Sequence, residues 1–225
     1  MHSSRILKKV KDDYNLIAEE FSGTRNFPWK DFKWFDEYYS KNFTVLDLGC
    51  GNGRLIKYLE KMGYKDYLGV DQSKKLIEFA KKTHKNNNFL LDDISKLKKI
   101  NNKYDVIFSI ASFHHIPKKL QLSTLIKWRT HLKNDGYLFM TNWNLRQKKY
   151  LPLYLRSIIF PRFGFKGVMV PWGNKLRRYY FAFSKYRIEK LLKIAGYKVI
   201  FNEYIDGDKN ANVFNAKNIL TIARK

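Results

Sequence analysis

Cysteine is almost absent from this sequence, and so are long apolar stretches. Cys50 is the only cysteine, which excludes an internal disulfide and a cysteine-rich zinc site. The most apolar stretch, Leu151 to Phe160, is interrupted by Pro152 and Arg156 and is too short to cross a bilayer. The first residues show no signal-peptide pattern. We therefore expect a soluble, cytoplasmic protein with no membrane partner and no metal site, in which Cys50 is structural.

Acidic residues are scarce relative to basic ones. The chain has 44 Lys and Arg against 20 Asp and Glu, a net charge of +24. Such an excess indicates a polyanionic partner, with nucleic acid favoured over an anionic membrane surface. An AT-rich genome would also raise the lysine content, but it would spread the charge evenly. Instead, the segment from Asn144 to Lys193 has thirteen Lys or Arg and only one acid, Glu189, which favours a local anion-binding face.

Strand and helix patterns alternate along most of the chain. Apolar runs typical of strands occupy residues 43–49, 66–71, 87–93, 104–112, 136–143, 197–205 and 218–224. Helical periodicity separates them at residues 53–63, 73–83, 119–133 and 186–196. This alternation predicts one α/β domain, residues 1–225, with a mostly parallel sheet and helices on both faces. Ligands of such sheets bind beyond the carboxyl ends of the strands.

Two segments lie outside this alternation. Residues 1–40 show a helical pattern from Val10 to Phe21 and a second short one after Pro28, and we interpret them as an N-terminal helical cap. Residues 144–184 show no regular pattern, and the segment is too long for a simple connection between two elements. Their many aromatic residues argue against disorder, so we interpret them as a substrate-binding insertion.

A glycine-rich turn follows the first predicted strand in the sequence VLDLGCGNGRL. Gly49, Gly51 and Gly53 allow the backbone to turn sharply and to approach a ligand closely. Dinucleotide-binding enzymes use a similar turn. Here, however, Asp47 lies within the strand, where its carboxylate would repel a pyrophosphate but can accept a hydrogen bond from the ammonium group of an amino acid.

Acidic residues also end the next two predicted strands. Asp71 ends the second, where a carboxylate can accept hydrogen bonds from two ribose hydroxyls. Asp92 and Asp93 end the third, where one of them can accept from the exocyclic amine of adenine. Together with Asp47 and the glycines, these acids describe a site for an adenosine that carries an amino acid.

These motifs resemble the class I S-adenosylmethionine-dependent methyltransferases. The resemblance implies a Rossmann-like fold with a seven-stranded, mostly parallel sheet whose last strand is antiparallel, and S-adenosyl-L-methionine as cofactor. It favours Asp93 over Asp92 for the adenine, because Asp-Ile-x-x-Leu starts there, and places Ile94 against the ring. Gln72 and Ser109 complete the expected cofactor set. A nucleotide-binding fold with another ligand is the alternative.

Four further stretches narrow the resemblance: VKDDYNLIAEEFSGTRNFPW, FSIASFHHI, GYLFMTNWNLRQ and VMVPWGNKLRRYYFAF. They resemble the eukaryotic-type tRNA methyltransferases that esterify 5-carboxymethyluridine at the wobble position, and they extend the likeness over essentially the whole chain. This family implies the anticodon stem-loop of tRNA as substrate and a small zinc-binding activator subunit as partner. The chain departs from the family at Phe181, where the family has histidine, and at KNDG, where it has a stop rich in glycine and proline.

A carboxylate acceptor is ionised at neutral pH and requires no general base, so the protein has to hold it in line with the methyl group. The residues that we expect to hold the carboxylate, and so to act in catalysis, are Arg25, His114, His115, Arg177 and Tyr179. The RNA-binding candidates are Arg25, Trp143, Arg146, Trp172, Arg177, Arg178, Tyr179 and Tyr180.

Two expectations concern aromatic residues in and near these motifs. Of Tyr179 and Tyr180, one ring should pack in the core and the other face outward. Trp29 and Trp34 are interpreted as packing residues.

Two other functions compete with this hypothesis. One is a methyltransferase of a small-molecule acid or phenol, which would leave the basic segment unexplained. The other is a non-catalytic RNA-binding module that has retained the fold. Against the latter, Asp47, the three glycines, Asp71 and Asp93 are all present.

Overall fold

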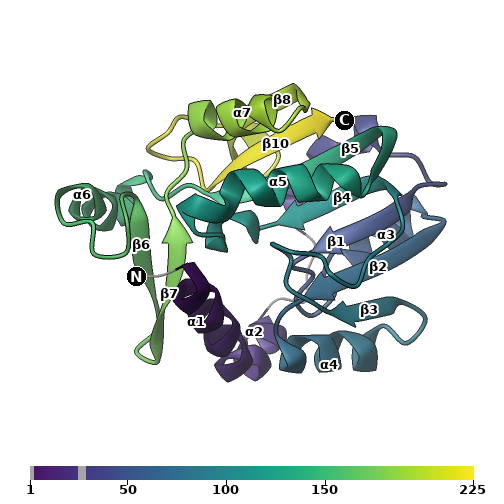
Figure 1. Cartoon of the computed structure of the whole chain (residues 1–225), viewed down its shortest axis with the longest axis horizontal. Helices are drawn as coiled ribbons and strands as arrows, with labels where there is room; N and C mark the ends of the chain where they lie inside the picture. The colour runs from purple at the N-terminus through teal and green to yellow at the C-terminus, as the bar shows by residue number, and fades with distance from the viewer. Residues whose placement is uncertain (1–2, 25–28) are drawn as a thin grey trace.

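The computed structural model describes residues 3–24 and 29–225, so Arg25 lies outside the described residues. One large sheet runs through the molecule (Figure 1). In spatial order its strands are β3 (Asn88–Leu91), β2 (Asp66–Asp71), β1 (Thr44–Leu48), β4 (Tyr104–Ile110), β5 (Leu132–Trp143), β10 (Asn218–Arg224), β8 (Lys198–Asp206) and β9 (Lys209–Asn210). The first five pair in parallel, and β10 is antiparallel to both of its neighbours. The predicted fold class is thus confirmed, and the two-residue β9 adds an eighth strand.

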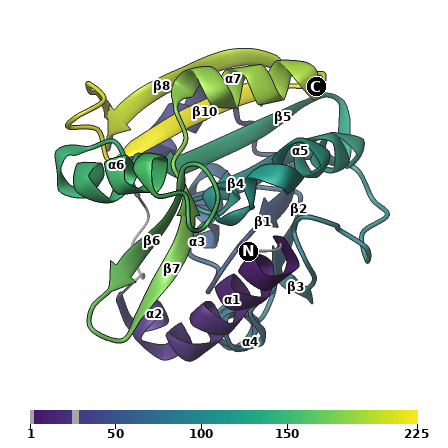
Figure 2. The same cartoon turned by 60° about the vertical axis from the view of Figure 1, so that its left-hand side comes forward.

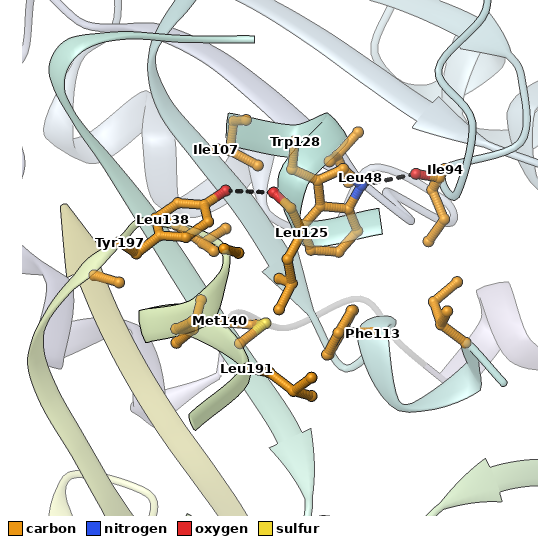
Figure 3. Packing of buried hydrophobic residues seen from close by; sticks show 14 of the residues in the cluster. Leu48, Ile94, Ile107, Phe113, Leu125, Trp128, Leu138, Met140, Leu191 and Tyr197 are labelled. Atoms are coloured by element: carbon orange, nitrogen blue, oxygen red, sulfur yellow. Dashed lines mark hydrogen bonds between the residues drawn. The ribbon is translucent and has the colours of Figure 1, made fainter. Parts of the chain in front are cut away.

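Helices cover both faces because the central strands are apolar on both sides. In β4, Ile107 packs with α5 (Gln121–Thr130) and α7 (Lys185–Ile194), whereas Val106 and Phe108 pack with α3 (Ile56–Met62), α4 (Lys74–Thr83) and the 3₁₀ helix η1 (Lys30–Tyr38). Two buried polar groups are satisfied in the first layer (Figure 3): Trp128 Nε1 donates to the Ile94 carbonyl at 2.7 Å and the Tyr197 hydroxyl to the Leu125 carbonyl at 3.0 Å. Such pairing avoids the cost of burying an unmatched donor.

The helix predicted from Val10 to Phe21 is two helices. These are α1 (Ser3–Leu16) and α2 (Ala18–Thr24), and α1 lies against strand β7 (Figures 1 and 2). Ile6 and Val10 of α1 pack on the Tyr179 ring, and Leu7 joins the layer under α5. The N-terminal segment is therefore anchored on two sides.

Residues 144–184 were expected to lack regular secondary structure, but most of them lie in helices and strands. They form the short 3₁₀ helix η4 (Lys148–Tyr150), the helix α6 (Leu151–Ile159) and an antiparallel hairpin of β6 (Gly167–Trp172) and β7 (Leu176–Phe181). The hairpin stands apart from the main sheet as a sheet of its own. Valines and aromatics favour these strands, and Gly173, at φ +51°, lies in the connecting turn.

The predicted helix over residues 119–133 is shorter than expected. Helix α5 ends at Thr130, and β5 already begins at Leu132. The turn signal Asn-Asp-Gly falls inside β5, where Asp135 has φ +63° and the pairing with β4 shifts between Tyr104 and Val106. The signal thus marks a strand irregularity. Two short 3₁₀ helices, η2 (Phe113–His115) and η3 (Lys118–Leu120), precede α5. Among the described residues, no helix is long and apolar enough to span a membrane.

Candidate functional site

A pocket opens where β1, β2 and β4 reach their carboxyl ends, which is the position expected for ligands in this sheet topology. It encloses about 1030 Å³, including the solvent at its mouth. Helix α1 and the β7 strand of the hairpin form the opposite wall, through Tyr14 and Arg178. Its lining combines carboxylates, the backbone of the glycine turn and aromatic rings, a mixture of polar and apolar groups that is typical of small-molecule sites.

The glycine turn forms the floor of this pocket. Gly49 has φ +81°, and a Cβ there would lie 2.4 Å from the Cβ of Ser112, so only glycine allows β1 and the segment after β4 to approach so closely. Gly51 also lines the pocket, and its backbone N–H donates to Asp71 at 3.0 Å. Gly53, assigned to the cofactor, does not line the pocket. Its missing side chain instead makes room for His84.

Asp47 is fully buried beside this turn and has one unmatched oxygen. Its Oδ2 accepts from the Tyr67 hydroxyl at 3.0 Å, whereas its Oδ1 has no hydrogen bond to any described residue. Burial raises the pKa of the Asp47 carboxyl to about 7. An ammonium group at Oδ1 would provide the missing donor and favour the ionised form.

The acids after β2 and β3 lie where the sequence predicted them. Asp71 lines the pocket and accepts from the Ser73 N–H at 2.8 Å, in addition to the Gly51 N–H, and Gln72 lines it beside Asp71. Burial raises the pKa of Asp71.

The structure separates the two acids after β3. Asp93 and Ile94 line the pocket, whereas Asp92 accepts hydrogen bonds from the Asp93 and Lys99 N–H groups and does not line it. The choice of Asp93 for adenine therefore agrees with the geometry.

Ser109, like Gly53, is a cofactor candidate that does not line the pocket. Its side chain is fully buried and hydrogen-bonds to Ser112 Oγ at 2.9 Å, and it does not line the pocket. Successive side chains of a strand point to opposite faces, and here the next residue, Ile110, lines the pocket together with Ser112.

His115 belongs to a chain of hydrogen bonds that fixes its tautomer. The ring Nδ1–H donates to the Tyr179 carbonyl at 2.6 Å, and Nε2 accepts from the Tyr14 hydroxyl at 2.8 Å. Arg178 Nη1 in turn donates to Tyr14 at 2.8 Å. Burial, with a smaller effect of Arg178, lowers the pKa of His115 to about 3, so the ring is neutral at pH 7.

His114 is a neutral donor that faces the pocket. Its Nδ1 accepts from the Trp143 N–H at 3.1 Å, which leaves the proton on Nε2. Burial, then the charges of His115 and Arg178, hold the pKa of His114 well below its usual range. The ring stacks on Tyr180 at 4.7 Å, and Tyr180 stacks on Trp143 at 5.2 Å. No described residue hydrogen-bonds to His114 Nε2.

Arg178 is a buried cation without an anion. Its side chain lines the pocket and the residue is only 3% exposed. Among the described residues, none hydrogen-bonds to its Nε, and no carboxylate lies within 4.0 Å. The guanidinium carbon lies 4.3 Å from the ring centre of Trp172 and 5.3 Å from that of Tyr180. Burying a charge is costly unless it is paired, so this arrangement is suited to a bound anion.

Arg177 and Tyr179, both assigned a catalytic role, face away from the pocket. Arg177 is exposed, and the Tyr179 ring packs on Ile6 and Val10 of α1. Alternation along β7 places Arg178 and Tyr180 on the pocket side instead. The expectation that one tyrosine ring faces outward was wrong, because α1 covers the outer one.

The other RNA-binding candidates and Phe181 also differ in whether they line the pocket. Trp143 lines the pocket, whereas Arg146 does not, and Trp172 lies behind Arg178. Phe181 packs in the core against Phe183 at 4.8 Å, so this departure from the family pattern does not touch the pocket.

Trp29, Arg54 and Tyr14 are among the pocket residues that sequence reasoning did not assign to the site. Trp29, interpreted as a packing residue, lines it, and the Arg54 guanidinium lies 4.2 Å above the Trp29 ring. Trp34 does pack, against Phe201, and donates to the Gly207 carbonyl. The motif that ends in Pro-Trp could have indicated Trp29. Arg54 could have been found from its position directly after the glycine turn. No local sequence pattern indicates Tyr14.

Comparison with known sequences supports the interpretation of the fold and pocket as those of a methyltransferase. A profile described as "Methyltransferase domain" matches residues 45–136. A tRNA (carboxymethyluridine(34)-5-O)-methyltransferase of Saccharomyces cerevisiae is 33% identical over 135 residues, 60% of this chain and 47% of its own. The Schizosaccharomyces pombe protein of the same name is 27% identical over 221 residues, 87% of this chain and 91% of its own. The chain spans about half the length of the first curated relatives that it matches, 49% and 47%.

Solved structures agree on the fold. A methyltransferase from Methanosarcina mazei has a TM-score of 0.72 at 18% identity and covers 85% of this chain and 96% of its own. The complex of the Haloferax volcanii Trm112 methyltransferase activator with a methyltransferase gives a TM-score of 0.69 at 17% identity, with 96% of both chains covered.

The pocket fits the cofactor that this fold and family imply, S-adenosylmethionine. The unmatched Asp47 oxygen suits its ammonium group, and the glycine turn leaves room for its close approach. Residues 45–136 therefore match a methyltransferase domain, the chain has the Rossmann-like class I methyltransferase fold, and its sequence resembles the tRNA carboxymethyluridine methyltransferases.

Proposed function

We propose that this protein is a tRNA methyltransferase that esterifies the carboxylate of 5-carboxymethyluridine, or a close derivative, at the wobble position of the anticodon loop. The names of the similar proteins support this substrate. The observation that carries the proposal is the buried, unpaired guanidinium of Arg178 in the pocket wall.

Arg178 is suited to hold the acceptor carboxylate. Its Nη1 donates to Tyr14, which fixes the plane of the guanidinium, and its Nε lacks a hydrogen-bond partner among the described residues, a partner that a bound anion would supply. The Tyr14–His115 chain fixes the position of that hydroxyl in turn. A guanidinium held in this way binds a carboxylate with strong, directional hydrogen bonds.

His114 supplies a second donor without competing for a proton. Its Nε2–H faces the same pocket, and its low pKa keeps the ring neutral at pH 7. A neutral donor orients one carboxylate oxygen and leaves the lone pair of the other available for attack. The acceptor is already ionised, so neither histidine has to act as a base.

Three acids hold the methyl donor on the other side of the pocket. Asp47 binds the ammonium group, Asp71 the ribose hydroxyls and Asp93 the adenine amine, with Ile94 against the ring. When bound, S-adenosylmethionine supplies its methyl group as the electrophile on a sulfonium. The largely apolar surroundings exclude water from the acceptor oxygen.

The aromatic stack of Tyr180 and Trp143 offers a surface for the uracil base. Tyr180 is buried, and the half-buried Trp143 stacks on Tyr180 at 5.2 Å and on Tyr150 at 6.3 Å. Trp143 and Tyr180 both line the pocket. Bases of single-stranded RNA loops commonly stack on such rings. We further propose that the chain acts with a small zinc-binding activator, as the named Haloferax volcanii complex suggests.

Methyl transfer to defined acceptors tests the proposal. The purified protein, alone and with a co-expressed activator, is incubated with labelled S-adenosylmethionine and with tRNA that does or does not carry 5-carboxymethyluridine. We expect label only in the modified tRNA. Equal labelling of free small acids and phenols would support the small-molecule alternative, and a protein that binds no S-adenosylmethionine would refute any methyltransferase activity.

A further inference from the structure

Lys166 lies next to the exposed ring of Phe165 and within electrostatic range of three other basic side chains that come from separate segments. Lys118 and Lys166 each place an ammonium group over the Phe165 ring, at 5.5 and 5.4 Å from its centre. Arg146 and Arg187 act on Lys166 electrostatically, as Lys118 does. Burial and these three positive charges lower the pKa of Lys166. The four residues are called the Phe165 cluster below.

The charge of this cluster is not compensated. None of the four makes an ion pair with a described acid, and Glu189, the only acid of the surrounding basic segment, pairs with Lys193. The side chains of Lys118, Arg146 and Lys166 donate no hydrogen bond to any described residue. Lys166 also has φ +67°, a backbone conformation that favours glycine or asparagine. Like charges held together repel, so the cluster is suited to an anion.

Hydrogen bonds connect the cluster to the pocket wall. Arg187 Nη2 donates to Gln121 Oε1 at 2.8 Å, and Gln121 Nε2 donates to the carbonyl of Ile116, a residue of the pocket, at 3.1 Å. Arg146 follows Trp143 by three residues, and Lys118 follows Ile116 by two. Gln121 thus links Arg187 of the cluster to the pocket wall.

We propose that Lys118, Arg146, Lys166 and Arg187 bind a backbone phosphate of an RNA strand whose adjoining nucleotide occupies the pocket. This inference rests on the proposed function, because it takes the pocket ligand to be part of an RNA. An RNA strand that continues from a nucleotide in the pocket carries a phosphate at every step, which favours RNA over a lipid headgroup. The exposed apolar residues Ile159 and Phe160 of the neighbouring α6 region would instead suit a membrane surface.

Binding of an unmodified anticodon stem-loop RNA tests the cluster, measured by fluorescence anisotropy over a range of salt concentrations. The test variant is Lys118→Gln/Lys166→Gln. Its matched control is Lys61→Gln/Lys65→Gln, two exposed lysines near the amino end of β2. Thermal unfolding confirms that both variants fold.

Affinity for single strands scales with salt with an exponent of about −0.7 per phosphate contact, so each contact contributes about fourfold at 0.15 M salt. We expect the test variant, which removes two of the four cations from this phosphate, to bind up to about fourfold more weakly, with a salt slope shallower by up to about 0.7. The control should match the wild type. A test variant that binds RNA like its control would overturn the proposal. The proposal would also be overturned if the test variant lost binding to phosphatidylserine vesicles but still bound RNA.

Because the RNA is unmodified, this result does not depend on the methyl acceptor. If the cluster fails while labelled ester forms on modified tRNA, only the phosphate site is wrong. If the cluster binds RNA as expected and no ester forms, the proposed acceptor is wrong.

Discussion

Replacing Arg178 with methionine removes the buried charge and keeps a side chain of similar length. Arg178 is 3% exposed, its Nη1 donates to Tyr14, and its buried Nε has no hydrogen-bond partner among the described residues. Hydrogen bonds to charged groups contribute about 1.5–3 kcal/mol, so losing the grip on the carboxylate should lower kcat/KM by about 10- to 150-fold. The assay is methyl transfer to tRNA carrying 5-carboxymethyluridine at limiting substrate.

Arg177→Met is the matched control for this variant. It makes the same change in charge one residue earlier, on the exposed face of β7 away from the pocket. We expect it to lower kcat/KM by no more than about fourfold, the size of a single phosphate contact, and only at low salt. Calorimetric titration with S-adenosylmethionine should give near wild-type affinity for both. Equal losses in the two variants would refute the assignment of the carboxylate to Arg178.

Three further predictions concern the pocket. Burial raises the pKa of Asp47 to about 7, and only the ionised form binds an ammonium group. The ratio of wild-type to Asp47→Asn affinity for S-adenosylmethionine should therefore fall about tenfold from pH 8 to pH 6. A constant ratio would contradict this role of Asp47. His115 has a folded pKa of about 3, below its unfolded value, so acid favours unfolding. Between pH 7 and pH 5, wild type should lose about 2 kcal/mol more stability in urea than His115→Gln. Gly49→Ala meets Ser112 at φ +81° and should lower the unfolding free energy by about 2 kcal/mol or more, whereas Gly23→Ala, with open space, should not; equal effects would count against the close approach.

The sequence was sufficient for the fold and for most of the cofactor half of the pocket. Strand, glycine turn and strand-end acid are local patterns, and parallel strands bring their carboxyl ends to one edge without further information. Asp47, Asp71 and Asp93 therefore lie where the pattern predicted them. Ser109 does not, because the pattern locates the end of β4 but not which of two adjacent side chains faces the ligand.

The acceptor half was harder to predict because it depends on register and on long-range packing. A one-residue change in register exchanges the two faces of a strand, and in β7 this difference separates Arg178 from Arg177. Tyr14 reaches the pocket only because α1 packs against β7, more than 150 residues away in sequence. No local motif encodes that contact.

The most direct test of the proposed chemistry is mass spectrometry of nucleosides from modified tRNA treated with the protein and methyl-deuterated S-adenosylmethionine. We predict that the deuterated methyl group appears on the wobble uridine as an ester that mild alkali removes, restoring 5-carboxymethyluridine. Label that resists alkali, on a base nitrogen, a ring carbon or a ribose oxygen, would contradict esterification of the carboxylate.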